Sequence, residues 1–216
     1  MMTDTIPAEL FLLLTNDAGR QDSTSYRKQA LAAAALAELA LRERIAIGEE
    51  RTPRVSVLDP RPLDLPVLDH ALAALAELDG KPIGSVIDHR SMDLTEVIGE
   101  GFAAAGAVQR KEGWFSTKWP THDDSLEAAL RARIAGAVAD PRTASLQDGI
   151  LLEILRALDI AHRILKTDLP ELSRRELDQR IKDLHIDHPA ATAVKKVMDD
   201  MTAVMIATTA AVTIST

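Results

Sequence analysis

Apolar positions recur at helical spacing along most of the chain, and the longest stretch of this kind runs from Gln29 to Ile47. Ala, Leu, Glu and Arg dominate this stretch, and neither Gly nor Pro interrupts it, so its intrinsic helix propensity is high. Its apolar residues occupy several neighbouring rows of the helix surface, which is typical of a helix buried on most sides. We therefore expect this helix to form the centre of the fold.

The same spacing, with cap and breaker residues between the segments, predicts a mainly α-helical protein of about nine helices. In chain order, the other predicted helices are 7–14, 67–78, 83–89, 93–105, 124–139, 145–165, 173–184 and 189 to near the end. Val55 and Val57 predict a short strand, for which Ile45 and Ile47 are the candidate antiparallel partners. The Pro-rich crossing over residues 60–66 is too short for an interdomain linker, so we expect residues 1–216 to form a single domain.

Composition excludes several classes of protein. The 216 residues include no Cys, which excludes disulfides and thiolate metal sites. The net charge of -8 argues against a nucleic-acid partner. The first residues lack the pattern of a secretory signal, and no apolar run is long enough for a membrane span. These features predict a cytoplasmic protein, whose contact with a membrane would be peripheral, at the inner membrane face.

A second hairpin is predicted over residues 107–120, with Lys111, Glu112 and Gly113 as its loop. It concentrates both Trp residues of the chain and one of its three Phe residues beside several cations. The candidate binding residues are Arg110, Lys111, Trp114, Phe115, Lys118 and Trp119. Trp and Lys together are typical of an interface with anionic lipid, and equally of a protein–protein hot spot. In a third interpretation, one Trp packs on the body of the protein and the cations are solvated.

Catalytic and metal-binding patterns are weak. His185 and His188 are three residues apart, but Pro189 follows at once and no third ligand is near in sequence, so we predict no metal site. His162 lies on an apolar helical face, where a core histidine is commoner than a catalyst. No Gly-rich phosphate loop and no nucleophile elbow occurs in the sequence. We therefore predict a protein that is not an enzyme and has no cofactor.

Several segments together resemble the Golgi phosphoprotein 3 family in its bacterial branch, in order and spacing across nearly the whole chain. The most specific is Glu38–Ile45, which resembles an ELALRGRL-type signature with Glu43 in place of Gly. The other matching segments are Ala8–Leu13, Asn16–Arg20, Leu68–Leu72, Ala105–Val108, the aromatic hairpin and Asp140–Ala144. The resemblance implies one helical domain around a central helix and a peripheral membrane adaptor that binds phosphatidylinositol 4-phosphate.

The lipid pocket of the family does not carry over residue by residue. The family uses a Trp, an Arg and two further basic residues, and the corresponding positions here are Ser23, Ala32, Met92 and Thr95. Cationic and aromatic residues lie close by in sequence, and they define a displaced anion site. Its candidate residues are Tyr26, Arg27, Lys28 and Arg90.

These observations give one leading hypothesis and two alternatives. The leading hypothesis is a non-enzymatic protein that docks on an anionic lipid headgroup or a membrane-associated protein through the hairpin. The first alternative is a soluble interaction module that forms a homo-oligomer through the same hairpin. The second is an enzyme or small-molecule binder with a site between helices that uses His162.

Overall fold

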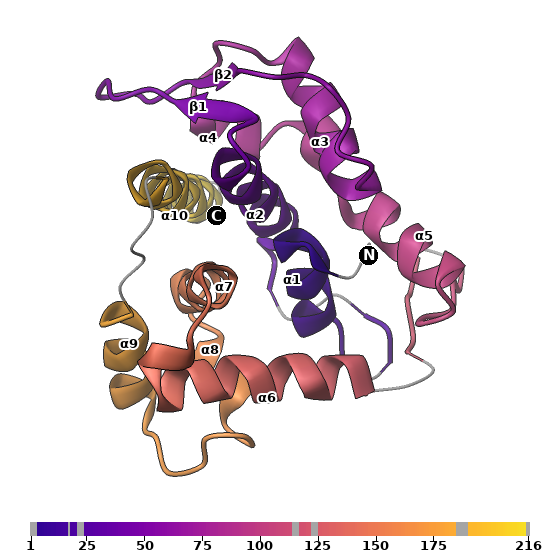
Figure 1. Ribbon diagram of the computed structural model, residues 1–216, viewed down its shortest axis with the longest axis vertical. Coiled ribbons are helices and arrows are strands. Elements are labelled where there is room, and N and C mark those ends of the chain that lie inside the picture. The colour runs from indigo at the N-terminus through magenta and orange to yellow at the C-terminus, as the bar shows by residue number, and fades with distance from the viewer. Residues whose placement is uncertain are drawn as a thin grey trace.

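The computed structural model describes residues 4–16, 18–20, 24–113, 117–121, 125–184 and 190–214, with side chains as far as residue 207. The described part of the chain is mainly α-helical, as expected, with one two-stranded sheet (Figure 1). The elements are α1 (Ile6–Leu14), α2 (Arg27–Leu41), β1 (Ile45–Ile47), β2 (Val55–Val57), α3 (Pro66–Glu77), α4 (Ile83–Ile87), η2 (Arg90–Met92), α5 (Thr95–Ala104), α6 (Ser125–Ala139), η3 (Pro141–Thr143), α7 (Leu146–Ala157), α8 (Ala161–Leu165), α9 (Arg174–Lys182) and α10 (Ala191–Ile214).

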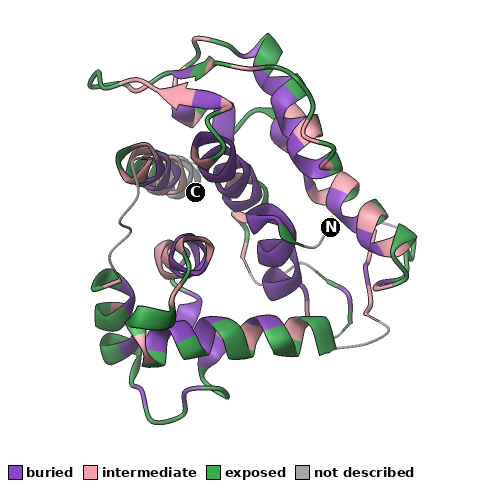
Figure 2. Ribbon diagram, viewed as in Figure 1, coloured by how far each residue is buried: buried purple, intermediate pink, exposed green. Residues whose placement is uncertain are grey.

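Helix α2 lies at the centre, as the sequence predicts. It contacts α1, α3, α4, α7, α10 and β1, and the residues from Ala30 to Ala40 are all buried (Figure 2). All nine residues of α1 are buried as well. The Ala side chains of α2 allow neighbouring helices to approach it from several sides, and this makes it the axis of one continuous core.

The central helix ends earlier than predicted, at Leu41 rather than Ile47. Glu43 adopts a φ of 56°, and the backbone N–H groups of Glu43 and Arg44 donate to the carbonyls of Ala40 and Leu39 at 3.1 and 2.9 Å. This is the Schellman arrangement that ends many helices. Residues 45–47 then form β1, which pairs antiparallel with β2, so the predicted strand pairing is confirmed.

A second Schellman arrangement divides the predicted helix 145–165 into α7 and α8. Asp159 adopts a φ of 59°, and the N–H groups of Asp159 and Ile160 donate to Arg156 and Leu155 at 2.9 and 3.0 Å. Apolar residues keep helical spacing across this break, so the pattern gives no sign of it. The predicted capping box at Ser173, which opens α9, is confirmed.

The second hairpin is present, but Lys111 does not belong to its loop as predicted. Lys111 and Lys118 exchange two backbone hydrogen bonds of 2.9 and 2.8 Å, and Val108 pairs with Thr121. Lys111 is therefore part of the paired arm, where it lies opposite Lys118.

Two buried carboxylates join helices α1, α6 and α7 through one arginine. Glu9 and Asp148 are 6% and 3% exposed, and both accept hydrogen bonds from the guanidinium of Arg133. The three residues come from α1, α7 and α6. This network satisfies two charges that would otherwise be costly to bury.

Candidate functional site

Trp119 is a core residue, and its expected place in a docking surface is wrong. Its side chain is 1% exposed and packs edge-on against Phe11, with ring centroids 6.5 Å apart. Its backbone N–H donates to Gly19 at 2.8 Å. The interpretation in which one Trp packs on the body of the protein describes this residue. Trp114 and Phe115 lie outside the described residues.

Arg110 lies among acidic side chains. Its guanidinium is 3.0 Å from Glu100, 3.6 Å from Glu112 and 3.9 Å from Glu96. Glu96 and Glu100 belong to one face of α5, against which the hairpin lies. Because these carboxylates compensate its charge, Arg110 contributes little positive potential to the hairpin, contrary to the expectation from sequence.

Lys111 and Lys118 are the cations that remain available on the hairpin. They form a directly opposed, hydrogen-bonded antiparallel pair, in which side chains project from the same face. Lys111 is exposed and Lys118 is half-buried. No ion pair holds either ammonium group within the described part of the chain.

The predicted anion site is brought together only in part. Lys28, near the start of α2, forms an ion pair of 2.5 Å with Asp93, so the α2 start and the segment that contains Arg90 are neighbours. The Tyr26 hydroxyl donates to the carbonyl of Met205 at 3.2 Å. Burial opposes ionisation of Asp93, but the Lys28 hydrogen bond keeps the pKa of Asp93 below its ordinary value. Lys28 is thus already paired with a carboxylate.

A shallow depression of about 480 Å³ lies beside this cluster, between α4 and α10. The residues that line it in the described structure are Gly84, Ser85, Asp88, His89, Val204 and Ala207. Tyr26, Arg27, Lys28 and Arg90 are not among them. The depression therefore presents an acid and a histidine rather than converging cations, and the predicted anion site is not assembled there.

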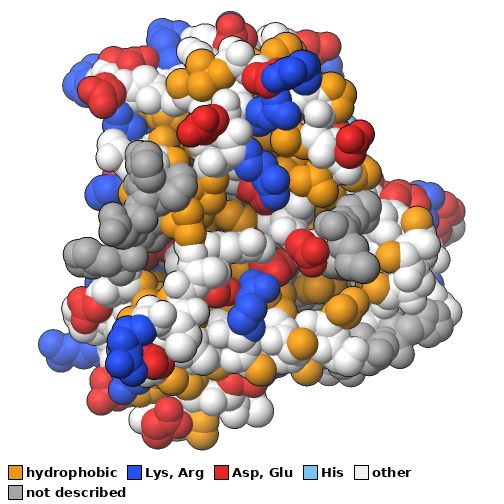
Figure 3. Space-filling model, viewed as in Figure 1, with side chains coloured by type: hydrophobic (Ala, Val, Ile, Leu, Met, Phe, Trp, Pro, Cys, Tyr) orange, Lys and Arg blue, Asp and Glu red, His pale blue; other side chains and the backbone are white. Residues whose placement is uncertain are grey.

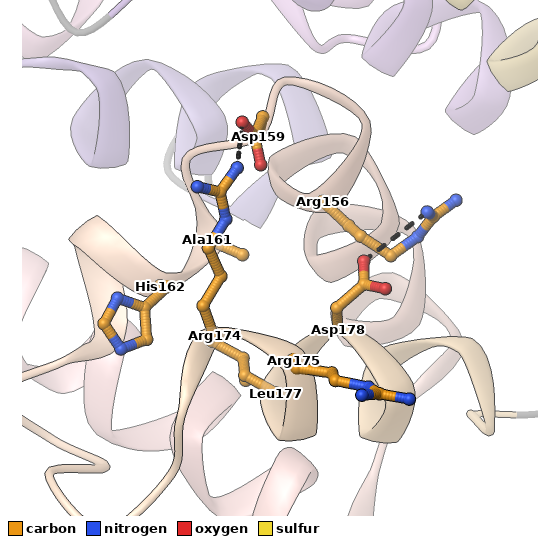
Figure 4. Close-up of a pocket in the computed structure, with 8 residues that line it drawn as sticks. All are labelled: Arg156, Asp159, Ala161, His162, Arg174, Arg175, Leu177 and Asp178. Carbon is orange, nitrogen blue, oxygen red and sulfur yellow. Dashed lines mark hydrogen bonds and ion pairs between the residues drawn. The ribbon is translucent and has the colours of Figure 1, made fainter.

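A second pocket, of about 430 Å³, lies where α7, α8 and α9 meet (Figure 4). Its lining includes three arginines, two aspartates and His162, on an apolar floor of Ala161 and Leu177. Sequence reasoning singled out His162 but missed the arginines. The Ser173–Glu176 capping box was the available signal, because it places Arg174 and Arg175 at the start of a helix.

The described helices include none that is both long and apolar enough to cross a bilayer. Within the described residues, no three His, Cys, Asp or Glu side chains are grouped so as to hold a metal ion. The pair His185 and His188 lies outside the described residues.

The fold defines a helical class of protein built around a buried, Ala-rich helix. The chain belongs to the Golgi phosphoprotein 3 (GPP34) family, whose model matches residues 6–201. A comparison with curated proteins finds no match.

Proposed function

We propose that this chain is a non-enzymatic, peripheral membrane protein of the adaptor type, which docks on anionic lipid headgroups through its second hairpin. The observation that carries the proposal is the opposed pair of Lys111 and Lys118. Membership of the Golgi phosphoprotein 3 family supports a role at a membrane surface.

The lysine pair favours an anionic ligand for a physical reason. Like charges directly opposite each other on one face of a hairpin destabilise the pairing. A lipid phosphate placed between Lys111 and Lys118 would relieve that repulsion. Each basic residue close to an anionic membrane contributes about 1 kcal/mol to its binding.

The hairpin is also firmly attached to the body of the protein. Trp119, next to Lys118 in sequence, is held in the core, so the backbone of the arm is fixed where the lysine pair lies. Positional order of this kind reduces the entropy lost on binding. Trp114 and Phe115, which lie between Lys111 and Lys118 in the sequence, are proposed to enter the interfacial region of the bilayer.

We propose general recognition of anionic lipid rather than selective recognition of phosphatidylinositol 4-phosphate. The positions of the family pocket hold Ser23, Ala32, Met92 and Thr95, none of which is basic. The face drawn in Figure 3 intersperses acidic and basic side chains instead of separating them. Attraction to a membrane would therefore be local to the hairpin, because the net charge of -8 opposes a wider approach.

Liposome co-sedimentation tests the proposal. Neutral vesicles, vesicles with phosphatidylserine, and vesicles with phosphatidylinositol 4-phosphate are compared at low and moderate salt. We expect the protein to sediment with both anionic preparations, and less so as salt rises. The double variant Lys111→Gln/Lys118→Gln should lose this binding, whereas Lys81→Gln/Lys166→Gln, which removes two other exposed lysines, should retain it.

Two outcomes would contradict the proposal. Binding that requires phosphatidylinositol 4-phosphate and survives the hairpin substitutions would place a selective pocket elsewhere. Absence of binding to every vesicle, together with a mass that rises with protein concentration and returns to monomer in the hairpin variant, would establish the soluble self-associating module instead.

A further inference from the structure

The two edges of the sheet formed by β1 and β2 differ in how their backbone groups are satisfied. On the outer edge of β2, the N–H of Val55 donates to the carbonyl of Lys81 at 3.0 Å, and the carbonyl of Val55 accepts from Gly80 at 2.8 Å. The N–H of Val57 donates to the Asp79 carboxylate at 2.8 Å. The segment that follows α3 therefore covers the outer edge of β2.

The outer edge of β1 has no such cover. The N–H of Gly48 donates to the carbonyl of Arg54 at 2.9 Å, which makes these two residues a hydrogen-bonded pair. Because hydrogen-bonded and non-hydrogen-bonded pairs alternate along an antiparallel ladder, the N–H and C=O groups of Ile45 and Ile47 point away from β2. These groups have no hydrogen-bond partner among the residues that the structure describes.

This free edge lines a groove of about 320 Å³ between β1 and the first turns of α10. Figure 1 shows α10 running past β1. On the helix side the groove is lined by Thr192, Ala193 and Lys196, and the two small side chains leave room for a further backbone beside the strand. The Lys196 ammonium donates to the carbonyl of Gly48 at 2.8 Å, which ties the helix to the end of the strand.

The groove carries more negative than positive charge. Its lining includes the carboxylates of Glu43 and Glu49 and the single ammonium of Lys196. Both glutamates are exposed, and neither forms an ion pair with any residue in the described ranges. Ile45 and Ile47 supply the apolar part of the lining. A ligand that is apolar in the middle and cationic at an end would complement this distribution.

We propose that an extended peptide segment of a partner protein, with apolar side chains and at least one Lys or Arg, adds to the outer edge of β1 as a third strand. Free N–H and C=O groups at a strand edge are a template for pairing with another chain. A helical ligand could not satisfy them, because its own backbone hydrogen bonds are internal. The inference rests on the proposed adaptor role, to which it adds a protein partner, but it requires neither the second hairpin nor lipid.

A phage-displayed library of random dodecapeptides, selected on the full chain, supplies the probe. The selected peptide is synthesised with a fluorescein label, and fluorescence anisotropy measures its binding in solution without vesicles. We expect it to be rich in β-branched residues and to contain Lys or Arg. Methylation of its backbone nitrogens at alternate residues gives two sets of derivatives. One set should bind about tenfold more weakly and the other almost as well as the parent, because only every second residue of a strand faces the edge.

Variants of the chain test the same pairing from the other side. Ile47→Pro removes one N–H donor from the edge, where Pro is tolerated, and should weaken peptide binding by about fivefold to tenfold. Ile47→Val keeps that N–H and should bind as the natural chain does. Glu43→Gln/Glu49→Gln should weaken binding and reduce its dependence on salt, whereas Glu77→Gln, at an exposed position of α3, should change neither. Circular dichroism verifies that each variant keeps its helical content.

Three outcomes would overturn the proposal: no peptide is enriched, both methylated sets bind alike, or the peptide binds Ile47→Pro as tightly as the natural chain. A mass that rises with protein concentration and returns to monomer in Ile47→Pro would assign the edge to a second copy of this chain instead. Peptide binding without sedimentation on any vesicle would refute lipid docking alone, and sedimentation without peptide binding would refute this inference alone.

Discussion

The indole ring of Trp119 lies directly on the backbone of Gly99. A Cβ atom built on Gly99 would be 2.3 Å from Cε2 of that ring, much closer than any non-bonded carbon contact. Gly99 belongs to α5 and Trp119 to the second hairpin, so this contact seats the hairpin on the helix. The position of the Lys111–Lys118 pair, the proposed docking site, depends on this contact.

Gly99→Ala is expected to destabilise the protein, although Ala is the better helix former. The new methyl group must displace a ring that the core surrounds, and overpacking of this kind costs about 1–3 kcal/mol. Urea denaturation measures the change in the free energy of unfolding. Gly136→Ala is the matched control: Gly136 lies in α6 with open space around it, and this substitution should stabilise by up to about 1 kcal/mol. Equal effects of the two substitutions would contradict the packing described.

Arg133→Ala is expected to weaken the junction of α1, α6 and α7. It leaves the buried carboxylates of Glu9 and Asp148 without their shared cation. Because Arg133 itself is 44% exposed, solvent moderates the loss, and we expect a cost of about 2–3 kcal/mol in the free energy of unfolding. Arg142→Ala is the control, since its ion pair with Asp140 is open to solvent and should be worth less than about 1 kcal/mol. A similar cost for both variants would contradict this account.

Glu43→Gly is expected to stabilise the protein. Glu43 follows the central helix with a φ of 56°, a conformation that an L side chain disfavours by about 1–2 kcal/mol and that Gly adopts readily. After the extra backbone entropy of Gly in the unfolded chain, we expect a gain of about 0.5–1 kcal/mol in the free energy of unfolding. Glu77→Gly, in an exposed position of α3, should instead destabilise. A loss of stability in Glu43→Gly would contradict the prediction.

The arrangement of helices could be predicted from the sequence to a large extent. The wide apolar band of residues 29–47 predicts a buried central helix, and Ile45 and Ile47 predict the strand that pairs with Val55 and Val57. Both are confirmed. What the pattern could not give is where two helices end. Glu43 and Asp159 adopt positive φ angles without being Gly, so the usual signal for a helix end is missing at both positions.

The surface was less predictable than the core. The alternation of the second hairpin does not reveal that Trp119 turns inward, because this depends on a gap over Gly99 in a distant segment. The carboxylates around Arg110 come from one face of a separate helix. Arg156 of α7 lines the same pocket as the arginines of α9 only because the chain reverses between α7 and α9. Each of these features is set by tertiary packing, which cannot be read from the local sequence pattern.

The carboxylate of Glu38 ties the central helix to the start of α1. One oxygen accepts a hydrogen bond of 2.7 Å from the backbone N–H of Ile6, and the other accepts from the Arg42 guanidinium. The side chain is 4% exposed. Burial raises the pKa of Glu38 above its ordinary value of 4.5, and the hydrogen bonds from Arg42 and Ile6 offset that effect only in part.

This shift predicts how stability depends on pH. Between 4.5 and the raised pKa of Glu38, the folded protein holds a proton that the unfolded chain has released. The contribution of Glu38 to the free energy of unfolding is therefore fully present below 4.5 and falls as the pH rises through the folded pKa. Glu38→Gln removes this titration, so the stability difference between the natural chain and the variant should shift against the natural chain as the pH rises.

Urea denaturation at a series of pH values from about 4 to about 8 measures that difference. Comparing how the two free energies of unfolding change with pH isolates the effect of protonating Glu38. A change in hydrogen bonding to Ile6 and Arg42 in the variant would shift its whole curve by the same amount at every pH. Glu77→Gln, at an exposed position of α3, should give a curve parallel to that of the natural chain. If Glu38→Gln also gives a parallel curve, the Glu38 carboxylate titrates alike in the folded and unfolded chains, and its burial is fully compensated by its two donors.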